Sequence, residues 1–114
     1  LPDLLARELA TAMIEAVGAD AAVVYVQLPG GDVRLVALAG TDTEGARDIA
    51  RMAGLGEHHG PGILLVEPIG RDSDGPRSVV VASTRPAGHA VLRRVRMMAA
   101  VARQGFELCG AREH

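Results

Sequence analysis

The pattern of apolar and polar positions in the first third of the chain predicts a helix followed by a hairpin. From Asp3 to Val17, apolar side chains recur every three or four residues, as they do on a helix with one buried face. Asp3 is a suitable N-cap, and Gly18 ends the pattern. Residues 19–28 then form a short β-branched run, which "PGGD" joins to "VRLVALAG" at 33–40. We therefore expect two antiparallel strands after the helix.

The rest of the chain repeats the order of helix and hairpin and ends in a long helix. Thr41 or Asp42 predicts the cap of a short helix, which glycines end before the loop "EHHGPG". The runs "ILLVEPI" at 63–69 and "SVVVAS" at 78–83 predict a second hairpin. The longest helix is expected from Ala90 to about Cys109.

The polar segment of the second hairpin, "GRDSDGPRS", poses a choice between a cation-binding loop and a turn. An EF-hand loop that starts at Asp72 needs an oxygen ligand at its fifth position and an acidic residue at its twelfth. Those positions hold Pro76 and Ser83. Asp, Ser, Gly and Pro in this order are typical of turns, so we predict a turn here and no metal site.

The apolar positions of the last helix fall into two strips beside a charged face. The first strip has the four-three spacing of a heptad and comprises Val91, Val95, Met98, Ala102, Gly105 and Cys109. The second strip comprises Met97, Val101 and Leu108. The charged face comprises Arg93, Arg96, Arg103 and Glu107. Because such a helix packs on a sheet and still offers a seam to a partner, we predict a homodimer whose interface includes Val91, Val95, Met98 and Ala102.

Taken in order, the predicted elements are a helix, two strands, a short helix, two strands and a long helix. This order indicates a single α+β domain, 1–114, built on an antiparallel sheet. The strands of the second hairpin are apolar on both faces, so both faces of the sheet need cover. We expect the terminal helices on one face and the short helix on the other. The chain begins at Leu1 rather than Met, and we expect it to be a fragment of a longer multidomain protein.

Composition narrows the classes of function. All twelve basic residues are Arg, which excludes Schiff-base chemistry and a Walker-type phosphate loop, because both need Lys. The formal net charge is -2 with both signs interspersed, and this argues against direct contact with nucleic acid or an anionic membrane. The only cysteine, Cys109, has no partner for an internal disulfide, and the apolar runs are shorter than a bilayer span. We expect a cytoplasmic domain.

Three polar side chains on apolar strands are candidate ligand contacts. Strand alternation puts Tyr25 and Gln27 on one face, and Val24 and Val26 on the face that suits helix packing. Glu67 interrupts the first strand of the second hairpin. Each of the three either lines a cavity or bonds a neighbouring protein group, and an Arg across the hairpin is an alternative partner for Glu67.

His58 and His59 are the remaining candidates for a site. Neighbouring side chains in a loop point apart, and the sequence has no closely spaced set of Cys or carboxylate residues to complete a coordination sphere, so we predict no metal site. In a functional role, the two histidines would face a ligand held under the short helix. The chain has no Ser in a Gly-flanked elbow, no Cys with an evident activating His and no recognisable carboxylate pair. We therefore predict neither an enzyme nor a cofactor.

Three segments together resemble a GAF domain over nearly the whole chain. "LARELATAMIEAVGADAAVVYV" resembles the first helix and first strand of that family, and "ILLVEPIGRDSDGPRSVVVAS" resembles its closing hairpin. The long terminal helix resembles the family's exit helix. Its end, "VARQGFELCGARE", is similar to the exit into the ATPase of enhancer-binding activators of the alternative sigma factor.

The resemblance implies a sensory module that binds a small-molecule effector or a partner. Such a module reports through its outer helices, which often pair in a dimer, to an attached output domain, here in transcription regulation. Only residues 40–62 lie where relatives build the lid over the ligand pocket, so a reduced or absent pocket is expected. The signature of the cyclic-nucleotide-binding members needs Asn and Lys, and this chain lacks both. Cys109 on the exit helix also argues against tetrapyrrole attachment.

A roadblock-like dimerisation scaffold is an alternative of a different class. It shares the order of elements and has no ligand. A void lined by Tyr25, Gln27 and Glu67 would favour sensing, and a filled one would favour the scaffold.

Overall fold

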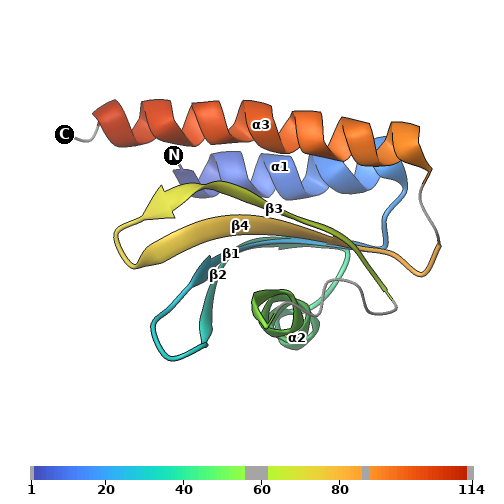
Figure 1. Ribbon diagram of the computed structural model, residues 1–114, viewed down its shortest axis with the longest axis horizontal. Coiled ribbons are helices and arrows are strands. Elements are labelled where there is room, and N and C mark those ends of the chain that lie inside the picture. Colours follow the sequence, from blue (N-terminus) through green and yellow to red (C-terminus); the bar gives the residue numbers. More distant parts are fainter. Residues whose placement is uncertain (1, 56–61, 86–87, 113–114) are drawn as a thin grey trace.

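The computed structural model describes residues 2–55, 62–85 and 88–112 (Figure 1). Its elements in chain order are α1 (Pro2–Val17), β1 (Ala21–Gln27), β2 (Val33–Ala39), α2 (Thr43–Gly54), β3 (Ile63–Asp72), β4 (Gly75–Ala82) and α3 (His89–Arg112). The predicted order of helices and hairpins is therefore confirmed. None of the described helices combines the length and the apolar character that crossing a bilayer requires.

The four strands form one antiparallel sheet in the order β2-β1-β4-β3. Each predicted hairpin pairs within itself, and β1 and β4 join the two hairpins at the centre of the sheet. In that central pair Val24 lies opposite Val79. Gly30 and Gly31 take φ values of 88° and 89° in the first hairpin, a conformation that glycine adopts without strain.

Helices cover both faces of the sheet, as the sequence predicted. Figure 1 shows α1 and α3 side by side on one face and α2 alone on the other. Beneath α1 and α3, the core contains large side chains from helices and strands, among them Met13, Val24, Ile69, Val79, Val81, Val95 and Phe106. This confirms an α+β fold with the terminal helices on one face and the short helix on the other.

The opposite face is covered by small residues. Ala46, Ala50 and Ala53 form the buried side of α2 and pack against a cluster that includes Tyr25 and Val80. Alanine brings a helix axis close to a sheet because it has no side chain beyond Cβ. Asp42 caps this helix through its side chain, which accepts a hydrogen bond from Gly45 N at 2.8 Å.

The polar segment of the second hairpin is a turn between β3 and β4. The Asp72 carboxylate accepts hydrogen bonds from Asp74 N at 3.2 Å and from Ser73 Oγ at 3.0 Å. Asp bonded to the backbone two residues further on is typical of such turns. The turn predicted from "GRDSDGPRS" is confirmed.

Candidate functional site

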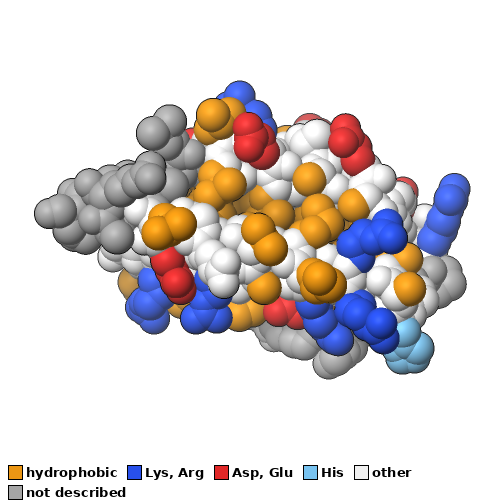
Figure 2. Space-filling view, turned by 90° about the horizontal axis from the view of Figure 1, so that it is seen from above, with side chains coloured by type: hydrophobic (Ala, Val, Ile, Leu, Met, Phe, Trp, Pro, Cys, Tyr) orange, Lys and Arg blue, Asp and Glu red, His pale blue; other side chains and the backbone are white. Residues whose placement is uncertain are grey.

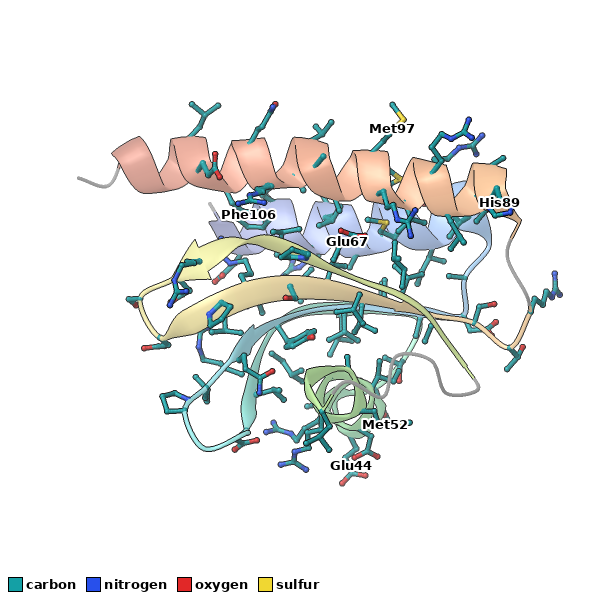
Figure 3. The ribbon with its side chains drawn as sticks, viewed as in Figure 1. Glu44, Met52, Glu67, His89, Met97 and Phe106 are labelled. Carbon is teal, nitrogen blue, oxygen red and sulfur yellow. The ribbon has the colours of Figure 1, made fainter. Side chains whose placement is uncertain are left out.

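The predicted ligand contacts do not gather in one place. Tyr25 and Gln27 lie on the face of the sheet that α2 covers. Glu67 instead faces α3 on the other side (Figure 3). Glu67 pairs with Val79 across the hairpin, and Val79 belongs to the core beneath the terminal helices. The register of the sheet therefore excludes a single void lined by Tyr25, Gln27 and Glu67.

Tyr25 and Gln27 are each packed against protein groups. Tyr25 is 2% exposed, and burial raises the pKa of its hydroxyl, while the neighbouring Ser78 side chain opposes the shift. The Gln27 side-chain amide lies so close to Gly54 that a Cβ at that position would overlap it. The absence of a side chain at Gly54 is what allows Gln27 to pack beside α2.

Glu67 has a protein partner as well, on a helix rather than across the hairpin. Its Oε1 lies 3.4 Å from Nε of Arg96 on α3, and its side chain is only 27% exposed. The ion pair joins β3 to α3. His58 and His59 lie outside the described residues.

A small pocket opens at one end of the sheet beside α2. It has a volume of about 250 Å³ and is lined by Asp20, Ala21, Ile49, Met52, Gly62, Ala82, Ser83 and Thr84. We call it the edge pocket. None of the residues that sequence reasoning proposed as ligand contacts lines it. Asp20 and Thr84 are 64 positions apart, so only the pairing of β1 with β4 brings them together.

The polar side of the edge pocket is fixed by hydrogen bonds. Asp20 Oδ2 accepts from the Thr84 backbone N at 2.8 Å and from Thr84 Oγ1 at 3.1 Å. These two bonds lower the pKa of Asp20 more than its partial desolvation raises it. The pocket therefore combines a charged carboxylate and hydroxyl groups with an apolar wall from Ile49 and Met52.

A larger groove runs along the outer side of α1 and α3. Its volume is about 790 Å³, and it is lined by Leu5, Glu8, Leu9, Ala12, Ala90, Arg93, Arg94, Met97, Met98, Val101, Ala102 and Gly105. Figure 2 shows hydrophobic side chains gathered along this face, with charged side chains around them. Met97 is 63% exposed and Val101 is 69% exposed. We call this surface the helix groove.

The predicted dimer stripe on α3 needs a correction. Val95 is 1% exposed and Ala102 is 6% exposed, because both pack in the core of the domain itself. Val91 and Met98 are half-buried. The apolar surface that α3 leaves open is instead the second strip, made of Met97, Val101 and Leu108.

A charged network ties the β3–β4 hairpin to the end of α3. Asp72 Oδ2 lies 3.0 Å from Arg34 Nη2 and 3.3 Å from Arg77 Nη2. Burial opposes the charge on Asp72, but hydrogen bonds from Asp74, Ser73 and Arg34 outweigh it and lower the pKa of Asp72 to about 2. The Arg77 guanidinium in turn lies 4.3 Å from the centre of the Phe106 ring, a cation–π contact.

The described part of the chain brings together no group of three His, Cys, Asp or Glu side chains that could hold a metal ion. Its polar clusters are ion pairs and turn contacts. Among the residues that the structure describes, these contacts join the sheet to the helices and do not assemble a recognisable catalytic constellation.

No family model matches the sequence, and no curated protein matches it either. Solved structures do resemble the fold. The GAF-B domain of DevS from Mycobacterium smegmatis superposes with a TM-score of 0.69 at 20% identity, covering 99% of this chain and 98% of that chain. A second crystal structure, of the second GAF domain of DevS from Mycobacterium smegmatis, has a TM-score of 0.68 at 20% identity and the same coverage. The chain has the fold of a GAF domain.

Proposed function

We propose that the domain is a non-enzymatic, cytoplasmic regulatory module that binds a small effector and signals through α3 to an attached output domain in transcription regulation. The observation that carries the proposal is the GAF fold, which extends over 99% of the chain. The similarity of residues 101–113 to the exit of enhancer-binding activators supports the choice of output.

The edge pocket is the effector site in this proposal. Its volume of about 250 Å³ is just below the ~300–1,000 Å³ of ordinary ligand sites, so it suits a compound of fragment size. The charged Asp20 carboxylate favours a cationic or hydrogen-bond-donating group. Ile49 and Met52 favour a short apolar portion beside that group. A small amine has both features.

Two contacts support transmission from the sheet to α3. Strand β4 contains both Arg77, whose guanidinium lies over the Phe106 ring, and Ala82, which lines the edge pocket. Strand β3 is tied to α3 by the ion pair between Glu67 and Arg96. A change in the position of these two strands would therefore move the contact points of α3.

A dimerisation scaffold without a ligand is the second candidate. The observation that favours it is the packing of α2, since Ala46 and Ala50 have no exposed surface and lie directly on the sheet. Tyr25 fills the space that a ligand beneath α2 would need. Under this alternative, the edge pocket binds no ligand, and dimerisation through the terminal helices is the only function.

Titration of the ¹⁵N-labelled chain with a panel of fragment-sized amines distinguishes the two candidates. The regulatory module predicts saturable shifts of the amides of Asp20, Ser83 and Thr84, and accompanying shifts in α3 near Arg96. Substitution Met52→Trp fills the pocket and should abolish both sets of shifts. The matched control Met52→Leu keeps the pocket open and should retain them.

The remaining outcomes are equally informative. If no amine gives saturable shifts at the edge pocket, the scaffold is the better account. If the pocket amides shift while those of α3 do not, the pocket binds ligands but the proposed path to the exit helix is wrong.

A further inference from the structure

The helix groove has the volume and the lining of a site for an apolar ligand. Its volume of about 790 Å³ lies within the ~300–1,000 Å³ of ordinary ligand sites. All of its lining residues except Glu8, Arg93 and Arg94 are apolar or glycine. Leu9 and Ala102, which are 7% and 6% exposed, form its floor, and Figure 2 shows the row of hydrophobic side chains along it. A ligand that fills the groove therefore needs a long apolar portion.

The two helices that form the groove run antiparallel, and two contacts mark its ends. Leu5 lies against Gly105, where an added Cβ would be 3.0 Å from Leu5 Cδ2. At the other end, Arg94 donates from Nη1 to the carbonyl oxygen of Ala16 at 3.1 Å. From Arg93 to Gly105 the groove follows α3 for about 18 Å at the helical rise of ~1.5 Å per residue. An extended hydrocarbon tail of about 14 carbons has this length at ordinary carbon–carbon bond lengths.

The charged residues of the lining are divided between the two ends of the groove. Arg93 and Arg94 lie at the end near Ala16. Glu8 lies less than one helical turn from Leu5, toward the other end. Among the residues that the structure describes, neither Arg93 nor Arg94 forms an ion pair with a carboxylate. Guanidinium groups make strong, charge-assisted hydrogen bonds to carboxylates. The arginine end of the groove therefore favours an anionic group, and the end with Glu8 disfavours one.

We propose that the helix groove binds a free long-chain fatty acid. Its carboxylate lies at Arg93 and Arg94, and its tail follows the exposed Met97 and Val101 toward Gly105. Methionine suits such a tail because its flexible side chain adapts to irregular apolar surfaces. Two guanidinium groups against one carboxylate favour an anionic head over a cationic one. This site is separate from the edge pocket and does not depend on an amine effector. If two copies pair through the terminal helices, as the sequence predicts, the bound tail competes with the second copy for this surface.

Titration of the ¹⁵N-labelled 114-residue chain with myristate, a fatty acid of the matching length, tests the site. Below the micelle concentration, myristate should give saturable one-to-one shifts of the amides that line the groove on α1 and α3. The double substitution Arg93→Gln with Arg94→Gln should raise the Kd for myristate by about tenfold and leave the Kd for tetradecanol, which has an uncharged head, unchanged. Arg103→Gln, on the same helix but outside the lining, is the matched control and should change neither Kd.

The placement of the tail is tested by chain length and by one charge in the groove. Octanoate should bind at least about tenfold more weakly than myristate, because its shorter tail buries fewer methylene groups. Val101 is 69% exposed and lines the groove, so Val101→Asp should weaken myristate binding by about tenfold while the domain stays folded. Ala100→Asp, at the neighbouring exposed position outside the lining, is the matched control and should retain binding. Circular dichroism checks that each variant is folded.

Four results would overturn the inference. The first is the absence of saturable shifts with myristate below its micelle concentration. The second is tetradecyltrimethylammonium binding as tightly as myristate, which would assign the head group to Glu8. The third is an equal loss of myristate and tetradecanol binding in the double arginine variant. The fourth is binding to phosphatidylglycerol vesicles without binding of free myristate, since the face would then serve a membrane. All are measured without an amine, so they leave the edge-pocket proposal to its own test.

Discussion

The face of the sheet beneath α1 and α3 is covered by large side chains, whereas the opposite face is covered by the alanines of α2. Met13 and Phe106 fill the first interface, and Ala46 and Ala50 close the second. The open space at the outer surface also differs in size between the two sides of the sheet. The helix groove leaves about 790 Å³ open between two long helices, and the edge pocket beside α2 has about 250 Å³.

This difference in packing limits the size of what can bind on each side of the sheet. A short alanine helix laid on a sheet leaves space only at its margin, so any ligand on that side is small. Two long helices packed side by side expose a broad apolar surface, so any partner on that side is large. The Arg77–Phe106 contact and the Glu67–Arg96 ion pair connect the sheet to the second of these surfaces.

The largest expected effect comes from truncation in the core beneath the terminal helices. Met13 has no exposed surface, and Met13→Ala should lower the free energy of unfolding by about 2–5 kcal/mol through lost burial and a residual cavity. Urea unfolding monitored by circular dichroism measures it. Met52→Ala at the edge pocket, where the side chain is 38% exposed, is the control and should cost clearly less. Equal losses would mean that the two faces do not differ in packing as described.

Enlargement should be the damaging change on the α2 face. Ala50 has no exposed surface, and Ala50→Leu should lower the free energy of unfolding by about 1–3 kcal/mol, because the helix must lift from the sheet. The same substitution at the exposed Ala100 on α3 should change it by no more than about 0.5 kcal/mol. A stable Ala50→Leu variant would reveal free space under α2 and revive a ligand site there.

Acid should weaken the hairpin network beneath α3. The pKa of Asp72 is lowered to about 2 from an ordinary value of 3.8, so its stabilisation is complete above pH 4 and is lost as the pH falls toward 2. Since the side chain is 22% exposed, we expect the loss to be about 1–2 kcal/mol. Unfolding free energies at pH 7 and pH 2 measure it. Asp72→Asn should remove this part of the pH dependence, and an unchanged profile in that variant would contradict the assignment.

The smallest expected effect is the coupling between Arg77 and Phe106. A double-mutant cycle with Arg77→Met and Phe106→Leu should give a coupling free energy of about 0.5–1.5 kcal/mol, because the guanidinium stacks on the ring in a largely buried position. The cycle removes the separate loss of the Asp72 ion pair from the result. A coupling near zero would remove one of the two links proposed between the sheet and α3.

Most of the fold follows from sequence patterns. Apolar periodicity and the glycines located every helix and hairpin, and two-sided apolar strands predicted a helix layer on each face. The sequence did not show which of the two apolar strips of α3 is buried in the domain. Two apolar strips ran along that helix, and spacing alone could not say which one packs on the domain's own sheet. The structure buries Val95 and Ala102 and exposes Met97 and Val101.

The candidate site was predicted less well because it depends on register. Alternation correctly placed Tyr25 and Gln27 on one face, but the face of Glu67 depends on its pairing with Val79 and on the irregular register of β3. The edge pocket arises where Asp20 meets Thr84, at the ends of two paired strands. Neither residue belongs to a recognisable motif. Hydrophobic pattern fixes which elements form, and side-chain register decides which polar groups meet.

The comparison of the two faces is tested most directly by placing one charge on each. Met97 in the helix groove is 63% exposed, and Leu55 at the end of α2 is 70% exposed. Sedimentation velocity of Met97→Glu and Leu55→Glu, beside the wild-type chain, measures which face holds a second copy. We predict that Met97→Glu is a folded monomer and that Leu55→Glu dimerises like the wild type. Dissociation by Leu55→Glu with Met97→Glu still dimeric would contradict the assignment of the terminal helices as the interaction surface.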